Sequence, residues 1–258
     1  MTCDEPAAEA GRADATDVAV ALWASLSVSQ VAKALGAQGI DVMVLKGPPL
    51  QQRLLGRECA YRSADVDVLV PRHHARRARR TLDADGWRTR PGNGVLWRLD
   101  RAIALERKGV VVDLHWGVHL AALPPWTLGA LERALWAGAV QAEAGWWEPR
   151  AEPLLVYLAL HAAAFGFTKP AGLVLIGAAI DLVHDWDEVE ALSRSIGAWP
   201  AVSHAVALAQ GGAPAAQPPL LRGARNVALV TLMGLLRQRL VPEPARRALR
   251  LARDRRRR

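Results

Sequence analysis

Two aspartates in a short apolar segment are the residues of this chain best placed to do chemistry. The segment, residues 64–70, reads ADVDVLV, and its alternation predicts a strand with Asp65, Asp67 and Leu69 on one face and the valines on the other. Two carboxylates roughly 7 Å apart on one face repel each other, and aspartate is a poor strand former. Because a bound cation offsets that cost, the segment predicts a metal site.

Two other segments can complete such a site. Lys46-Gly47 follows a short apolar strand and precedes a helix that starts with proline, an arrangement that presents backbone N–H groups and a lysine to an anion. In the segment VVVDLHW, residues 110–116, Asp113 and His115 share one face of a second predicted strand. If this strand pairs beside the first, Asp113 becomes a third carboxylate of the site.

Three strand carboxylates beside a phosphate-binding turn suit nucleotidyl transfer assisted by Mg²⁺, which prefers carboxylate and phosphate oxygens. Two Mg²⁺ ions roughly 4 Å apart can clamp the attacking and leaving oxygens of an in-line displacement. We expect Asp65 and Asp67 to hold the ions on the triphosphate and Lys46 to neutralise phosphate charge. Asp113 would complete the second ion or accept the proton of the acceptor.

The residues around these acids have structural as well as catalytic interpretations. Asp113 could instead pair with Arg101 or Arg107. Arg62 could form an ordinary salt bridge, or it could reach the triphosphate or brace Asp67.

Ser63 is either a turn residue or a phosphate ligand. His115 could orient Asp113, contact the substrate, or be a hydrogen-bonded strand histidine. Trp116 belongs to the core or lines a nucleobase pocket.

The remaining pattern predicts an α+β protein. Residues 17–123 alternate short strands and helices, which predicts a small mixed β-sheet domain with flanking helices. Strand signals vanish from Pro124 onward, and residues 124–244 predict an all-helical C-terminal domain. Residues 1–16 are expected to be disordered, and residues 245–258 form a basic, arginine-rich tail.

The composition favours a cytoplasmic protein with a substantial core. Of the 258 residues 51% are hydrophobic, which argues against global disorder. Cys3 and Cys59 make no metal-ligand or disulfide spacing and fit a reducing compartment. The N-terminus does not read as a signal peptide, and the longest apolar run, residues 171–180, is about half of a membrane span, so we expect no membrane association.

The basic charge is concentrated at one end of the chain. The formal net charge is +8, and the tail from Arg246 to Arg258 carries most of it. Such a tail is either a solvated end or an electrostatic arm for a nucleic acid or another acidic partner.

The order of the motifs resembles a known family. LKG at residues 45–47, R-x-x-D-x-D at residues 62–67 and VDLHW at residues 112–116 are similar to uncharacterised bacterial nucleotidyltransferases of the DNA polymerase beta-like superfamily, of the type found near lasso-peptide gene clusters. LALH at residues 158–161 and the Asp-Leu and Asp-Trp pairs that follow extend the resemblance, which covers residues 42–212.

This resemblance implies a nucleotidyltransferase domain joined to a helical domain, with Mg²⁺ as cofactor and an NTP as substrate, ATP being the expected donor. It implies phosphate binding by Lys46, Gly47, Arg62 and Ser63, and a cleft-facing His161, which by itself would read as a core histidine.

One departure from the family pattern concerns the phosphate-binding turn. Many superfamily members place Gly-Ser after the first strand, whereas Pro48 and Pro49 follow Gly47 here. Since proline has no backbone N–H, phosphate binding must rest on Lys46, Gly47 and later amides.

The acceptor is expected to be a natural-product peptide, a small molecule or an RNA, with pyrophosphate released. Two other functions are compatible with the same motifs. The chain could be a non-catalytic, nucleotide-binding accessory protein of a biosynthetic cluster, or a toxin-like enzyme that modifies tRNA, for which the arginine tail would be the docking arm.

Overall fold

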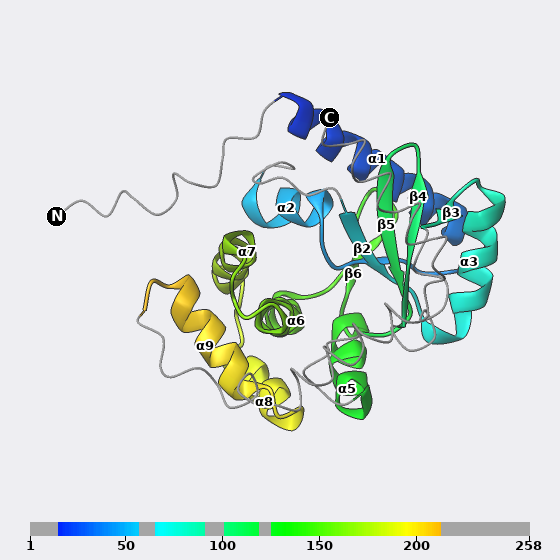
Figure 1. Cartoon of the computed structure of the whole chain (residues 1–258). Helices are drawn as coiled ribbons and strands as arrows, with labels where there is room; N and C mark the ends of the chain where they lie inside the picture. The colour runs from blue at the N-terminus through cyan, green and yellow to red at the C-terminus, as the bar shows by residue number, and fades with distance from the viewer. Residues whose placement is uncertain (1–14, 57–64, 91–100, 119–124, 213–258) are drawn as a thin grey trace, which may run out of the picture.

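The computed structural model describes residues 15–56, 65–90, 101–118 and 125–212 (Figure 1). Within them the helices are α1 (Ala15–Gly36), α2 (Pro48–Leu55), α3 (Ala75–Ala84), α5 (Pro125–Trp136), α6 (Ala151–Ala164), α7 (Pro170–Ile180), α8 (Trp186–Ser195) and α9 (Trp199–Ala209), and a 3-10 turn, η1 (Arg72–His74), precedes α3. The strands are β1 (Met43–Val44), β2 (Asp65–Leu69), β3 (Arg88–Thr89), β4 (Ala102–Arg107), β5 (Val110–His115), β6 (Val140–Gln141) and β7 (Trp147–Glu148).

The strands of the described residues form one mixed, seven-stranded sheet in the order β3-β4-β5-β2-β1-β7-β6. Strands β2 and β5 run parallel with Asp67 opposite Asp113, whereas β4 and β1 are antiparallel to their neighbours β5 and β2. The predicted pairing of the two acid-bearing strands is therefore confirmed. The β4–β5 hairpin turns at Lys108-Gly109, whose φ angles of 50° and 82° suit a two-residue primed turn.

Helices lie on both sides of the sheet (Figure 1), and its two faces belong to separate hydrophobic cores. On one face, Val66, Val68 and Val70 are fully buried and pack with apolar residues of α1 and α3. On the other face, Met43 and Leu69 pack with apolar residues of α5, α6, α7 and α9. Because Leu69 shares its face with Asp65 and Asp67, the helical part of the chain covers the acid-bearing face.

Two short strands occur where none was expected. Strands β6 and β7 form a hairpin, and β7 pairs with β1, so the sheet continues past Pro124. The prediction that strands end at Pro124 was therefore wrong. Each of these strands has two residues, which is too short for an alternating pattern to be recognised. From α6 to α9 the described chain is helical, as predicted.

Several predicted features lie outside the described residues. These are the N-terminal residues 1–14, the segment 57–64 with Arg62 and Ser63, and the residues after 212, which include the arginine tail.

Helix α1 is the one described helix that is long and apolar enough to cross a membrane. Length and composition alone are weak evidence for a membrane span, because core helices of soluble proteins can be equally long and apolar. One side of α1, with Val28 and Leu35, packs into the core behind the sheet, whereas Leu22 and Leu26 are exposed.

Candidate active site

Three carboxylates meet on the face of the sheet that the helical part covers. Asp65 and Asp67 project from β2, and Asp113 lies opposite Asp67 on β5. One carboxylate oxygen from each residue lies within 4.8 Å of the other two. Asp67 is 5% exposed, and Asp65 and Asp113 are partly buried. We call these three residues the acid cluster.

The Lys46-Gly47 turn lies directly against the acid cluster. Lys46 follows β1, and its Nζ lies 3.3 Å from Oδ2 of Asp67. Gly47 immediately precedes α2 and has a φ of 101°. A Cβ at this position would lie 2.9 Å from the carbonyl oxygen of Asp65, so only glycine fits between the turn and β2.

Side chains from the Lys46-Gly47 turn, β5 and α6 surround Asp67. Besides Lys46, His115 of β5 places Nε2 3.9 Å from Oδ2 of Asp67, and the phenol of Tyr157 on α6 hydrogen-bonds the carboxylate. Burial acts to raise the pKa of Asp67, but the charges of His115 and Lys46 outweigh it, and the pKa is lowered. Burial and the Asp67 charge raise the pKa of Tyr157 well above its usual value, so the phenol stays protonated and donates.

The pKa of Asp113 shifts in the opposite direction, upward. Burial has the largest effect, and the charges of Asp67 and Asp65 add to it, so that the pKa of Asp113 is raised to about 6. Lys46 and Arg90 lower this pKa but do not compensate for the burial and the like charges. The cluster therefore holds more negative charge than its surroundings neutralise, which a bound cation would relieve.

Helix α6 brings a histidine to Lys46. Nε2 of His161 lies 3.4 Å from Nζ of Lys46. Burial and the Lys46 charge lower the pKa of His161 to about 4, so the imidazole is neutral and its Nε2 accepts from the ammonium. Burial would lower the pKa of Lys46, but Asp67 and Asp65 raise it, so the lysine stays charged.

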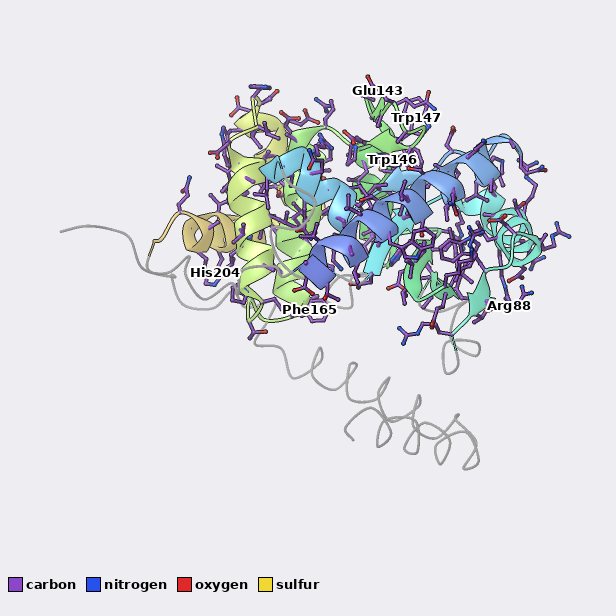
Figure 2. The ribbon with its side chains drawn as sticks, turned by 90° about the horizontal axis from the view of Figure 1, so that it is seen from above. Arg88, Glu143, Trp146, Trp147, Phe165 and His204 are labelled. Carbon is purple, nitrogen blue, oxygen red and sulfur yellow. The ribbon has the colours of Figure 1, made fainter. Side chains whose placement is uncertain are left out.

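A row of aromatic side chains on α6 runs from the contact between His161 and Lys46 toward the surface. The ring of His161 lies 6.2 Å from the ring of Tyr157 and 5.0 Å from that of Phe165, between centroids. Nζ of Lys169 lies 3.7 Å from the centre of the Phe165 ring, in cation–π contact. Phe165 is 45% exposed and is labelled in Figure 2.

Of the residues in this row, His161 was predicted from the sequence to face the cleft, whereas Tyr157 and Phe165 were not predicted. All three lie at four-residue intervals, so they share one side of α6. The surrounding residues are almost all apolar, and the segment therefore reads as a core helix. The four-residue spacing from His161 is the signal that could have identified the other two.

The structure does not bring every candidate residue to the cluster. His115 shares the acid-bearing face, but Trp116 is 7% exposed and packs in the core behind the sheet. Arg107 pairs with Asp85, not with Asp113. Arg62 and Ser63 lie outside the described residues.

The donor set of the acid cluster fits a hard divalent cation. Carboxylate oxygens are the ligands that Mg²⁺ prefers, and three of them converge here, with Nε2 of His115 3.9 Å from Asp67. The adjoining Lys46-Gly47 turn supplies a partly buried ammonium at the start of a helix, which suits a phosphate group.

A comparison with family models identifies the family of this chain. A family model described as "Uncharacterised nucleotidyltransferase" matches residues 14–211, well over half of the chain. The solution structure of the antibiotic-resistance factor ANT(2'')-Ia is similar with a TM-score of 0.41 and 14% sequence identity, over 74% of this chain and 92% of that one. No curated protein matches. The chain belongs to this nucleotidyltransferase family, and it is an enzyme that transfers nucleotidyl groups.

Proposed function

We propose that this enzyme transfers a nucleoside monophosphate from an NTP, with ATP as the donor to test first, to an acceptor in a Mg²⁺-dependent reaction. The observation that carries the proposal is the acid cluster, whose three carboxylates converge beside Lys46. A bound cation would compensate the excess negative charge of such a cluster.

The acid cluster would hold the Mg²⁺, with Asp67 between its two partners. Bound Mg²⁺ would neutralise phosphate charge and favour the deprotonated form of the acceptor. Asp67 is the best positioned of the three ligands, because Lys46, His115 and Tyr157 all fix its carboxylate.

The Lys46-Gly47 turn defines the triphosphate side of the site. Lys46 stays charged and is held by Asp67 and His161, so its ammonium needs little reorganisation to pair with phosphate. Gly47 lets the chain turn beside Asp65 and brings the start of α2 to the same place. Pro48 and Pro49 at the helix start donate no N–H groups, so the lysine carries more of this role.

The reaction forms one bond and breaks one bond at the α-phosphorus. An acceptor oxygen or nitrogen attacks this phosphorus, and the bond to the β-phosphate oxygen breaks, so pyrophosphate leaves with the bond electrons. The acceptor loses one proton, which passes to Asp113 or to solvent. Asp113 is on the side of β2 opposite the Lys46-Gly47 turn, where an in-line attacking group would enter.

The direct test is pyrophosphate release from MgATP by the full-length chain, together with α-labelled nucleotide transfer to cell extract components or to the protein itself. The variant Asp65→Asn/Asp67→Asn should abolish release and weaken Mn²⁺ binding measured by calorimetry. Glu143→Gln, at an exposed acid of the β6–β7 hairpin that Figure 2 labels, is the matched control and should change neither. Tight nucleotide binding without turnover would support the accessory-protein alternative instead.

A further inference from the structure

A second lysine lies at the far end of the row of aromatic side chains that begins beside Lys46. Tyr157, His161 and Phe165 lie at four-residue intervals on α6. The row therefore runs about 12 Å along the helix, from the carboxylate that Tyr157 contacts to the α6–α7 turn. At that end Nζ of Lys169 lies 3.7 Å from the centre of the Phe165 ring. The charge of Lys169 reaches back along the row, because it contributes to the lowered pKa of His161.

The charge of Lys169 is not neutralised by an acid. No carboxylate of the residues that the structure describes forms an ion pair with Lys169, and its side chain is exposed. The cation–π contact with Phe165 positions the ammonium instead. An aromatic ring holds a cation without cancelling its charge, so Lys169 keeps a full positive charge for an anion. Lys46 differs in this respect, because Asp67 pairs with it.

Three side chains offer hydrogen-bond donors along the row. The ammonium of Lys46 has three N–H groups, of which Asp67 and Nε2 of His161 take two. Because Nε2 of the neutral His161 accepts, the ring proton is assigned to Nδ1, which can donate. With Lys169, the row presents two cations and a neutral donor between them. Such an arrangement matches an anion that carries several phosphate groups.

The turn that carries Lys169 is held in place by its own contacts. Phe167 has a φ of 58°, which is uncommon for a residue other than glycine. Its ring packs 4.9 Å from the ring of His204 on α9, which Figure 2 labels together with Phe165. The hydroxyl of Thr168 donates to the carbonyl of Phe165 at 2.8 Å. Backbone conformations of this kind persist where packing holds them, and they are frequent at ligand-binding sites.

We propose that Lys169, with His161, binds the terminal phosphate of the donor NTP and makes the enzyme select a triphosphate over a diphosphate. The proposal rests on the proposed function and adds a specificity-determining residue for its donor. The α-phosphate must lie at the acid cluster, where the bond to the leaving pyrophosphate breaks. Since Lys46 marks the phosphate side of the cluster and the row leads from Lys46 away from Asp67, the β- and γ-phosphates follow the row toward Lys169.

A nucleobase stacked on Phe165 is the competing assignment, because an exposed aromatic ring is also a stacking platform. Lys169 already lies over one face of this ring, so a base could stack on that face only by displacing the ammonium. A phosphate needs no such displacement, since it binds the ammonium itself. The contact between Lys169 and Phe165 therefore favours the phosphate.

The test compares α,β-methylene-ATP, a triphosphate that cannot be cleaved at the transfer position, with ADP, which lacks the third phosphate. Calorimetry on the full-length chain in Mg²⁺ measures the affinity for each. The variant Lys169→Gln removes the ammonium, whereas Lys169→Arg keeps a cation at this position. Lys33→Gln, at an exposed lysine in the last turn of α1, makes the same charge change elsewhere and is the matched control.

We expect Lys169→Gln to lower the affinity for α,β-methylene-ATP by about tenfold and that for ADP by less than about twofold, because the lost contact is charge-assisted and involves the third phosphate. Lys169→Arg and Lys33→Gln should each leave both affinities within about threefold of the unaltered protein. Inorganic tripolyphosphate, which has no base, should displace α,β-methylene-ATP, and Lys169→Gln should weaken this competition by a similar factor.

Three results would overturn the proposal. Equal losses for α,β-methylene-ATP and ADP would assign this end of the row to the base or the ribose. Unchanged affinities in Lys169→Gln would show that the ammonium does not reach the donor. An equal loss in Lys33→Gln would reduce the effect to the net charge of the protein.

The proposed transfer reaction fails in a different way, because these binding measurements do not depend on turnover. If Lys169→Gln loses the triphosphate preference while the unaltered protein never releases pyrophosphate from MgATP, the donor site is supported and the transfer reaction is overturned. That combination would favour the nucleotide-binding accessory function. If the unaltered protein binds neither nucleotide, the reaction and the donor site are both overturned.

Discussion

Asp67 and Asp113 lie directly opposite each other on adjacent parallel strands, yet their pKa values move in opposite directions. The difference comes from their neighbours. Lys46, His115 and Tyr157 all reach Asp67, whereas burial and two like charges dominate at Asp113. One acid therefore stabilises the metal-free fold when it is charged, and the other destabilises it.

Asp113→Asn should stabilise the metal-free protein at pH 7.5 while abolishing transfer. The folded-state pKa of about 6 exceeds the ordinary 3.8, so the native state holds the extra proton between these values and its stability falls as pH rises through that window. Above pH 6 the charged Asp113 lowers the free energy of unfolding by up to about 3 kcal/mol. Urea unfolding in EDTA at pH 7.5 and pH 4.5 measures it. A variant less stable than the unaltered protein at pH 7.5 would contradict the assignment, and Glu143→Gln serves as the exposed control.

Asp67→Asn should have the opposite effect on stability. The folded pKa lies below 3.8, so the charged carboxylate contributes stability above pH 3.8 that is lost as pH falls through the folded value. The substitution also leaves the Lys46 ammonium without its nearest carboxylate, at a cost on the order of 2 kcal/mol at pH 7.5. Unfolding of the single variants and of Asp67→Asn/Lys46→Met checks this, because removal of both partners should recover part of the loss.

Tyr157→Phe tests whether the helical part of the chain positions the acid cluster. The substitution keeps the ring in the core and removes the hydrogen bond to Asp67, so stability should fall by about 1 kcal/mol. Mn²⁺ affinity measured by calorimetry should fall by about tenfold, as for other residues that orient metal ligands. Phe165→Leu, at the exposed end of the same helix, should leave Mn²⁺ affinity unchanged. Equal effects of the two variants would mean that Tyr157 only packs.

The acid cluster was largely predictable from the sequence because it depends on two short periodic patterns. Alternation along residues 65–69 and 110–115 places Asp65, Asp67 and Asp113 on defined faces, and a parallel pairing then brings them together. The Lys46-Gly47 turn follows equally from a strand end, a glycine and a proline-started helix.

The partners of the cluster were harder to predict because they depend on tertiary packing. Tyr157 belongs to a helix that is apolar on all sides, and only the packing of α6 over the sheet gives its hydroxyl a carboxylate to reach. Arg90 and Glu106 reach the same face through register across β3 and β4, and no local pattern specifies that register.

Gly47→Ala should be far more damaging than an alanine at the other end of the same helix. At Gly47 a positive φ of 101° combines with a Cβ contact of 2.9 Å to the backbone of Asp65. At Gly56, which ends α2 with a φ of 69°, nothing lies within 4 Å of a Cβ. Gly56→Ala therefore measures backbone strain alone, about 1 kcal/mol, and Gly47→Ala should exceed it by on the order of 2 kcal/mol in urea unfolding. Nucleotide binding should fall only for Gly47→Ala; similar results for both variants would show that the contact with β2 is unimportant.

His161→Gln should make the protein less sensitive to acid. The folded pKa of about 4 lies below the ordinary 6.5, so the unfolded state binds more protons between these values and the native state loses stability as pH falls from 6.5 toward 4. The loss due to this residue reaches about 3 kcal/mol. Glutamine cannot titrate but can still accept from Lys46, so the stability of His161→Gln should fall less between pH 7.5 and pH 5 than that of the unaltered protein.

The contribution of Asp113 has the opposite sign in this range and is present in both proteins, so it cancels in the difference. His184→Gln, at an exposed histidine between α7 and α8, is the control and should follow the unaltered protein. Parallel stability curves for all three proteins would mean that His161 is not held neutral against Lys46.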